Sequence, residues 1–304
     1  MVDLSVDLGP MKLKNPLIAA SGTVGAVYDF SSVGRLDYYG AAVAKSVSPE
    51  PWRGRPAPRL GPANLGMLNG IGIQNSGIDA WVRDASPHIA DLSVPIWGSA
   101  VAECAEGFIK VATGLESAGV LAIEVNLSCP NLDNGTMFSF DADASASVVS
   151  GIRNAVRLPI GAKLSPETPD IVEVAQAVAA SGADWVVLTN TVSGAAIDVE
   201  SRRPVLSGTI GGYSGTPLKP IALRCVWQVS RALPDIPIVG CGGISSGEDI
   251  VEYLLAGATA TAVGTAHFDE PRVGARLIKE LTRYCTRQGV LRVADLIGAA
   301  EMWE

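Results

Sequence analysis

Short apolar runs of strand length recur along the whole chain, and each ends in small or polar residues. Runs of this kind are typical of strands that are buried on both faces. The intervening stretches, such as 170–182, 219–233 and 247–258, carry apolar residues at helical spacing, and several end in a glycine that suits the end of a helix. The strand-like runs cover residues 16–21, 41–46, 94–100, 122–128, 160–165, 185–191, 236–243 and 260–266.

This alternation of strands and helices predicts a parallel sheet closed into a (β/α)8 TIM barrel. An open doubly wound sheet is the weaker alternative, because no strand is followed by a GxGxxG turn. The period of two in the fourth run turns Glu124, Asn126 and Ser128 inward, where polar side chains suit a barrel mouth. Alternation over residues 2–8 predicts a short N-terminal β-hairpin at the barrel bottom. Without a linker, residues 1–304 are expected to form a single domain.

The composition argues against several classes of function. A net charge of -8 at pH 7 disfavours nucleic acid and anionic membranes as partners. No apolar run approaches the ~20 residues of a membrane helix, and the N-terminal segment lacks the pattern of a signal peptide. Five cysteines without a CxxC spacing fit neither a disulfide framework nor a zinc or iron–sulfur site. We therefore expect a cytoplasmic protein without a metal site.

In TIM barrels the carboxyl ends of the strands carry function. The turns after the seventh and eighth strands, "GCGGISSGED" and "GTAHF", lie where such barrels commonly hold a phosphate, although these glycines could simply turn the chain. With two histidines in the chain, a Ser-His-Asp triad or a histidine-rich metal site is poorly supported. The strand-end residues are Ser21, Lys45, Ser46, Ser99, Asn126, Lys163, Asn190, Thr191, Gly242, Gly243, Gly264 and Thr265.

Lys45 and Lys163 both lie near strand ends and could point inward, where an unpaired ammonium group is costly. For Lys163 two interpretations stay open. It could form an ion pair with Glu124 on the adjacent strand, or it could meet an anionic group of a ligand, such as a carboxylate, a phosphate or the N1–C2=O edge of a reduced flavin.

Cys129 differs from the other cysteines by its position. It follows the fourth strand, and Pro130 disfavours a helix there. Without a histidine to activate it, Cys129 is better suited to act as a general base than as an acylated nucleophile. Cysteines are usually packed as small apolar residues, and we expect this of Cys104, Cys225 and Cys285 in predicted helices. Cys241, at the end of the seventh strand, is expected to serve packing rather than chemistry.

Seven motifs together resemble class 1 dihydroorotate dehydrogenases over residues 4–284. The most specific is "NLSCPN" at 126–131, although dihydropyrimidine dehydrogenases carry a similar stretch. The other motifs are "NPLIAASGT", "LNGIGIQNSG", "KLSP", "LTNT", "GGYSGTPLKPIALR" and "IPIVGCGGISSGEDIVEYLLAGATATAVGT".

The resemblance implies a barrel that binds FMN and oxidises (S)-dihydroorotate to orotate in pyrimidine biosynthesis. Cys129 would then be the catalytic base, and Lys45 would lie between the flavin and the substrate carboxylate. The implied substrate-binding residues are Lys45, Asn69, Gly70, Ile71, Gly72, Ile73, Asn126, Asn190 and Thr191. The implied FMN-binding residues are Ser21, Lys45, Ser46, Ser99, Asn126, Lys163, Thr189, Gly215, Gly242, Gly243, Gly264 and Thr265.

Gln74 and the stretches at 190–206 and 211–224 resemble the class 1B enzymes, although Ile73, Ser76 and Tyr213 depart from the commoner residues. Class 1B implies electron transfer to NAD⁺ through a separate subunit with FAD and a [2Fe–2S] cluster, around a homodimer core of a heterotetramer. The alternatives are a fumarate-linked class 1A enzyme, a dihydropyrimidine dehydrogenase-like reductase, a Schiff-base aldolase that uses Lys163 or Lys45, and a non-catalytic phosphate-ligand module. Whether segments 48–70 and 191–217 act as lids is left open.

Overall fold

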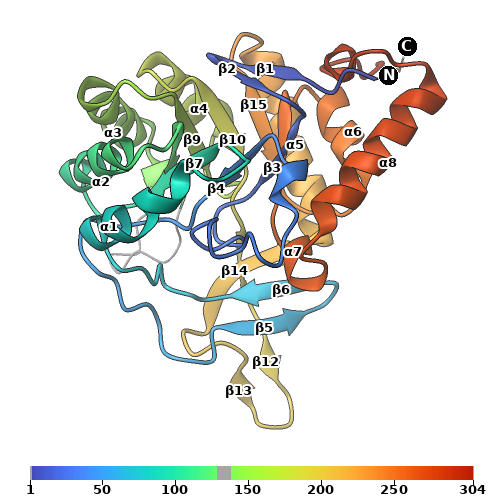
Figure 1. Ribbon diagram of the computed structural model, residues 1–304. Helices are drawn as coiled ribbons and strands as arrows, with labels where there is room; N and C mark the ends of the chain where they lie inside the picture. The colour runs from blue at the N-terminus through green and yellow to red at the C-terminus, as the bar shows by residue number, and fades with distance from the viewer. Residues whose placement is uncertain (1, 129–137, 304) are drawn as a thin grey trace.

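The computed structural model describes residues 2–128 and 138–303, so Cys129 lies outside the described residues. Eight parallel strands close into a barrel, each within a run expected from the sequence (Figure 1). The predicted TIM barrel is therefore confirmed, and the open sheet is excluded. In spatial order the strands are β3 (Leu17–Ala19), β4 (Ala41–Val43), β7 (Ile96–Ala100), β8 (Ala122–Asn126), β9 (Ile160–Leu164), β10 (Trp185–Leu188), β15 (Ile238–Cys241) and β16 (Ala260–Val263), which pairs with β3.

Helices surround the barrel, and local signals explain where they begin and end. The Asp170 side chain accepts hydrogen bonds from the first turn of α4, and Ser246 and Asp249 form a capping box on α6. Gly119 and Gly289 end α2 and α8 in the left-handed region. The helices are α1 (Ile78–Ile89), α2 (Ala105–Ala118), α3 (Ala142–Ala155), α4 (Ile171–Ala180), α5 (Lys219–Ala232), α6 (Gly247–Leu255), α7 (Ala266–Asp269) and α8 (Val273–Gln288), with 3-10 turns η1 (Leu36–Tyr38), η2 (Phe138–Phe140), η3 (Thr216–Leu218) and η4 (Val293–Leu296).

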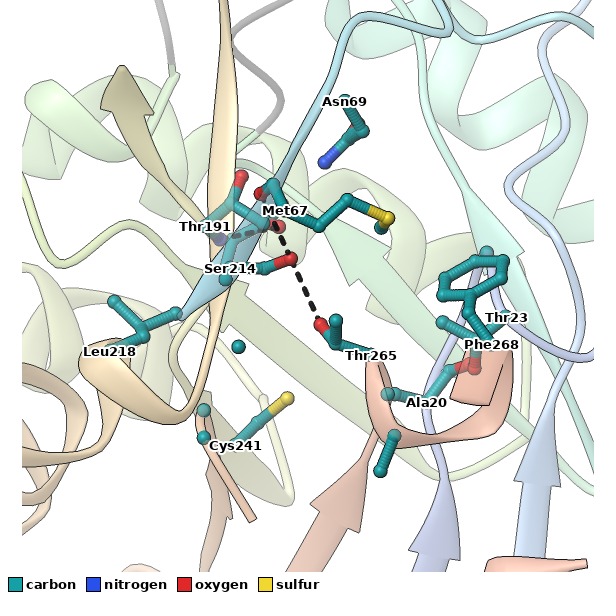
Figure 2. Close-up of a pocket in the computed structure, with 18 of the residues that line it drawn as sticks. Ala20, Thr23, Met67, Asn69, Thr191, Ser214, Leu218, Cys241, Thr265 and Phe268 are labelled. Atoms are coloured by element: carbon teal, nitrogen blue, oxygen red, sulfur yellow. Dashed lines mark hydrogen bonds between the residues drawn. The ribbon is translucent and has the colours of Figure 1, made fainter. Parts of the chain in front are cut away.

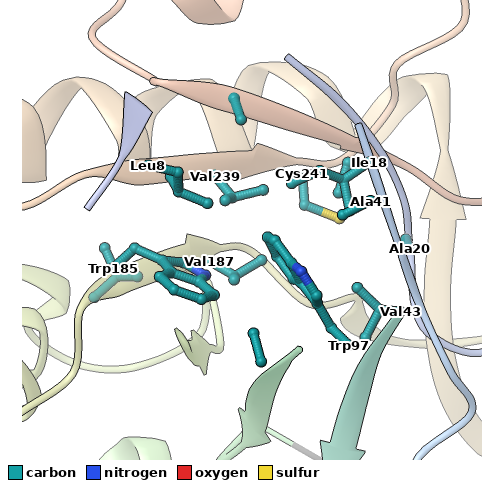
Figure 3. Packing of buried hydrophobic residues seen from close by; sticks show 14 of the residues in the cluster. Leu8, Ile18, Ala20, Ala41, Val43, Trp97, Trp185, Val187, Val239 and Cys241 are labelled. Atoms are coloured by element: carbon teal, nitrogen blue, oxygen red, sulfur yellow. The ribbon is translucent and has the colours of Figure 1, made fainter. Parts of the chain in front are cut away.

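The barrel bottom is closed by the predicted hairpin, β1 (Val6–Leu8) and β2 (Met11–Leu13), and by two tryptophans. Trp97 and Trp185 are fully buried, and their ring centroids lie 4.9 Å apart (Figure 3). Gly161 makes room for this pair, because a Cβ atom there would lie 2.2 Å from Trp185 Nε1. Large apolar side chains therefore fill this end of the barrel.

The opposite end carries an antiparallel sheet that the sequence pattern did not predict. The segments 48–70 and 191–217 supply its strands, which pair in the order β11 (Val192–Ala195), β14 (Ile210–Gly215), β6 (Gly66–Asn69) and β5 (Leu60–Ala63). A two-stranded ribbon, β12 (Ile197–Asp198) and β13 (Arg203–Pro204), projects beyond it (Figure 1). In Figure 1 this sheet lies below the barrel, on the side away from the β1–β2 hairpin.

The cysteines divide differently from the expectation. Cys225 and Cys285 are buried in α5 and α8, as predicted. The prediction for Cys104 is wrong, because this residue is the exposed N-cap of α2. Within the described ranges, no helix is long and apolar enough to cross a membrane.

Candidate functional site at the barrel mouth

A cavity of about 960 Å³ opens at the carboxyl ends of the barrel strands, between the barrel and the antiparallel sheet. Both lysines singled out in the sequence reach it, and so do the glycine turns after β15 and β16. The predicted site residues that line it are Ser21, Lys45, Ser46, Asn69, Ile71, Ile73, Asn126, Lys163, Thr189, Asn190, Thr191, Gly215, Gly242, Gly243, Gly264 and Thr265. Gly70, Gly72 and Ser99 do not line it, and Cys129 lies outside the described residues.

A chain of hydrogen bonds fixes the hydroxyl and amide groups on one wall. Ser99, which is fully buried, shares a hydrogen bond of 2.9 Å with Ser46, and Asn126 Nδ2 donates to Ser46 Oγ at 3.2 Å. Ser128 Oγ donates to Asn126 Oδ1 at 3.2 Å. Ser99 therefore stands behind the wall and holds Ser46, while Asn126 faces the cavity.

The amide of Asn190 is oriented by both of its polar atoms. Its Nδ2 donates to Ser128 Oγ at 3.0 Å, and its Oδ1 accepts a hydrogen bond of 2.8 Å from the Thr191 N–H group. On the facing sheet, Asn69 Nδ2 donates to the Gly212 carbonyl at 3.1 Å. Because these amides are held in place, they offer a ligand neutral donors and acceptors with little loss of side-chain freedom.

Lys163 forms the expected ion pair with Glu124 and also faces the cavity. It lines the cavity, and its Nζ lies 3.7 Å from Glu124 Oε1, with both side chains almost completely buried. Burial raises the pKa of the Glu124 carboxyl, and Lys163 acts in the opposite direction. Burial lowers the pKa of Lys163, but Glu124 and Cys241 outweigh it, so the net shift is upward. The cavity floor therefore holds a cation backed by a buried carboxylate.

The turn after β15 is shaped for a close approach of backbone to a ligand. Gly242 and Gly243 have φ values of 145° and 69°, a region that favours glycine. Behind the turn, Asp249 Oδ2 accepts from the Ser245 and Ser246 N–H groups, both at 2.8 Å. Lys219 Nζ donates to Asp249 Oδ1 at 2.8 Å. This support from α5 and α6 holds the turn rigidly against the cavity.

The turn after β16 has a different property. A Cβ atom at Gly264 would meet Ala20 and Thr23 at ordinary distances of 3.5 and 3.6 Å, so the described residues do not require glycine there. Next to it, Thr265 Oγ1 donates to Ser214 Oγ at 2.9 Å, which ties the barrel to β14 (Figure 2). Because Gly264 lines the cavity and has no side chain, its backbone can be approached closely by a ligand.

Sequence reasoning missed several residues of this site. Cys241, predicted to serve packing alone, lines the cavity, as do Ser214 and Thr23. Thr23 Oγ1 donates to the Ala20 carbonyl at 2.8 Å, so it accepts from His267 Nδ1 at 2.9 Å. Tyr39 OH then donates to His267 Nε2 at 2.8 Å. Burial lowers the pKa of His267 to about 4, so the neutral ring supports Thr23 from behind.

A rigid glycine turn, a buried cation and fixed amides lie around one cavity of the TIM barrel, and such a combination suits an anionic, phosphorylated ligand. Within the described ranges, no group of three histidine, cysteine, aspartate or glutamate side chains is placed to hold a metal ion.

Comparisons with known proteins identify the family. The family model for dihydroorotate dehydrogenase matches residues 3–284. The chain is 43% identical over 302 residues to the dihydroorotate dehydrogenase B (NAD(+)) catalytic subunit of Geobacter sulfurreducens, covering 99% of each chain. It is 43% identical over 308 residues to the protein of the same name in Phocaeicola vulgatus, covering 99% of this chain and 100% of that one. The chain therefore belongs to the dihydroorotate dehydrogenase family.

A solved structure supports the fold. The crystal structure of DHODH from Eimeria tenella in complex with ferulenol superposes with a TM-score of 0.81 at 21% identity, covering 98% of this chain and 88% of that chain.

Proposed function

We propose that this chain is the FMN-dependent catalytic subunit of an NAD⁺-linked dihydroorotate dehydrogenase, which oxidises (S)-dihydroorotate to orotate in pyrimidine biosynthesis. Relatives over almost the whole chain carry the name of that subunit. The observation that carries the proposal is that Lys45, Lys163, the fixed amides and two glycine turns line the same cavity. We take residues 1–304 to form a single FMN-binding domain.

The residues around the cavity fit FMN. A volume of about 960 Å³ accommodates a flavin and a small substrate together. Gly242, Gly243, Gly264 and Thr265 would hold the phosphate, with Gly215 beside them, because their backbone approaches an anion without steric cost. Lys163 would face the polar edge of the ring, and Ser21, Ser46 and Thr189 would contact the ring system. When bound, FMN supplies the acceptor for a hydride.

The substrate would bind through one cation and several neutral groups. Lys45 would pair with the carboxylate of dihydroorotate, and Asn69, Asn126, Asn190 and Thr191 would bond its ring. Ile71 and Ile73, which line the cavity, would complete the pocket. Neutral amides are suited to this task because additional positive charge would bind the equally anionic product too tightly.

Proton removal is assigned to Cys129. As a general base, its sulfur would take the C5 proton of dihydroorotate while the C6 hydrogen leaves as hydride, so the new C5=C6 double bond completes orotate. The electrons would leave through a partner subunit with FAD and a [2Fe–2S] cluster, around a homodimer core in the cytoplasm. The word "subunit" in the names of the relatives supports a partner.

The proposal is tested by comparing two reductants under anaerobic conditions. Purified protein is expected to release one FMN on denaturation, and its flavin absorbance is expected to bleach rapidly with dihydroorotate and very slowly with dihydrouracil. The difference arises because only dihydroorotate offers Lys45 a carboxylate. Protein that cannot be reconstituted with FMN, or that is bleached equally by both compounds, would contradict the proposal.

A further inference from the structure

The buried carboxylate of Glu124 has no role in the proposed reaction, and its place in the barrel is unusual. Glu124 points into the barrel from β8, and only 2% of the residue is exposed. In the strand register it lies opposite Ser99 on β7 and Gly161 on β9, one layer below the pair of Asn126 and Lys163. It therefore lies between the layer of the bottom tryptophans and the floor of the cavity, and it does not line the cavity itself.

Glu124 is also poorly satisfied where it lies. Its Oε1 atom makes no hydrogen bond with the described residues, and the 3.7 Å to Lys163 Nζ is longer than a hydrogen bond. Burying such a carboxylate is costly, and a buried ion pair often stabilises a fold no better than apolar residues of the same size. Stability is therefore a poor explanation for this pair, and its effect on the cavity is a better one.

The electrostatic consequence follows from the charges alone. Lys163 and Glu124 together carry no net charge, whichever of the two holds the shared proton. A hydride carries two electrons and one proton, so its arrival in the cavity adds one negative charge. A lone Lys163 cation would stabilise that charge strongly, whereas a Lys163 backed by Glu124 stabilises it less. Cys241 also lies beside Lys163, and its thiol is neutral because burial raises its pKa.

We propose that Glu124 is a positioning residue that directs the Lys163 ammonium toward the cavity and offsets part of its charge, so that electrons received by bound FMN leave again readily. This inference rests on the proposed function, because it requires FMN in the cavity. Glu124 would thereby affect both steps of the reaction. A stronger cation would favour reduction of FMN by the substrate and hinder its reoxidation.

The test measures the redox equilibrium of the bound flavin against a reference dye, without turnover. In Glu124→Gln, the ratio of reduced to oxidised flavin at a fixed solution potential is expected to rise about tenfold, equal to about 30 mV for a two-electron couple. Lys163→Met should lower this ratio. The double variant with Lys163→Met and Glu124→Gln should have the same ratio as Lys163→Met alone. A Glu124→Gln ratio within twofold of the wild type, or below it, would overturn the inference.

Asp184→Asn is the matched control. This variant also changes the carboxylate of an ion pair to an amide, since Asp184 Oδ2 lies 2.7 Å from Arg153 Nη2. Asp184, however, lies at the start of β10, near the barrel bottom. Its flavin equilibrium should equal that of the wild type, and a rise as large as that of Glu124→Gln would overturn the inference.

Two further outcomes keep the test decisive. If Glu124→Gln does not fold, Glu124→Asp replaces it: the shorter side chain moves the carboxylate away from Lys163, and a rise of about threefold is expected, whereas an unchanged ratio would overturn the inference. If dihydroorotate reduces the wild-type flavin but the Glu124 variants do not change the flavin potential, this inference alone is contradicted. Wild-type protein that binds no FMN contradicts the proposed function first.

Discussion

The two ends of the barrel interior are built from opposite kinds of side chain. At the bottom, the fully buried rings of Trp97 and Trp185 pack at an interplanar angle of 43°, and even their indole N–H groups make no hydrogen bond with the described residues. At the mouth, Asn126 and Asn190 are held in a chain of hydrogen bonds, and Lys163 lies above a buried carboxylate. One end is stabilised by shape, and the other is organised by polar contacts that leave room for a ligand.

Residues that stabilise the fold and residues that line the cavity are therefore only a few positions apart on the same strand. On β9, Gly161 accommodates a tryptophan and Lys163, two residues further, lines the cavity. Substitutions at the bottom should therefore change the free energy of unfolding and leave the ligand equilibria intact, and substitutions at the mouth should do the reverse. Three sets of substitutions test this separation, and a fourth prediction concerns the stability of buried His267, which does not line the cavity.

The largest effect is expected for Cys129→Ala, which removes the proposed general base. Removing a general base should lower turnover by about two to four orders of magnitude, while orotate binding stays close to that of the wild type. Cys129→Ser should retain slow turnover with a pH optimum at higher pH, because an alcohol gives up its proton less readily. Steady-state assays with dihydroorotate check this, and unchanged turnover in the alanine variant would remove Cys129 from its assigned role.

At the bottom, Trp185→Ala is expected to lower the free energy of unfolding by about 3–5 kcal/mol, because it leaves a large cavity beside Gly161. Trp185→Phe should cost much less, since the lost Nε1–H makes no hydrogen bond with the described residues. Denaturant unfolding measures both. A loss of FMN affinity in Trp185→Phe that exceeds its loss of stability would show that the two ends are not independent.

Lowering the pH should reduce the contribution of His267, behind the barrel mouth, to the free energy of unfolding. His267 has a pKa of about 4 in the folded protein, against 6.5 for the ordinary side chain, so the unfolded chain binds the proton more readily. Stability from this residue is complete above about pH 6.5 and is lost as the pH falls toward 4, by about 3 kcal/mol in total. Denaturant unfolding between these pH values should show that the free energy of unfolding falls with pH, and His267→Gln should reduce this slope.

The exposed His88 provides the control for this experiment. His88→Gln should leave the slope between pH 6.5 and pH 4 unchanged. A slope that disappears in His88→Gln and persists in His267→Gln would contradict the assignment to His267.

The smallest effect compares two asparagines at opposite ends. Asn190→Ala should weaken orotate binding about tenfold, as expected for one lost hydrogen-bonding amide. Asn15→Ala, at the start of β3, should destabilise the fold instead, because Asn15 bonds the Tyr38 carbonyl and the Leu17 N–H group at 3.0 Å each. Titrating orotate against the flavin spectrum measures the first effect, and an equal weakening in Asn15→Ala would break the comparison.

Apolar periodicity was enough to predict the eight strands and the inward face of β8, because burial on both sides leaves a strong local signal. It failed for the sheet of β5, β6, β11 and β14, whose strands are short and half exposed and in which β6 and β14 pair across more than a hundred residues. The contact between Thr23 and His267 joins residues 244 positions apart, and no local pattern can reveal it.

Strand ends in the sequence also do not distinguish a cavity wall from the layer behind it. Ser99 was expected at the flavin edge because it is a polar residue at the end of β7. In the register it lies opposite Glu124, one layer below the cavity, and it bonds Ser46 instead of lining the wall. Conversely, Cys241 looked like packing and faces the cavity. Such differences of one residue depend on strand stagger, which the sequence does not show.

The most direct test of a barrel whose mouth performs the chemistry is an anaerobic titration of the FMN-loaded protein with dihydroorotate. The proposed function predicts that one equivalent of dihydroorotate bleaches one equivalent of flavin and yields one equivalent of orotate, without any partner protein. Flavin that stays oxidised in the presence of excess dihydroorotate, or that is bleached without formation of orotate, would contradict it.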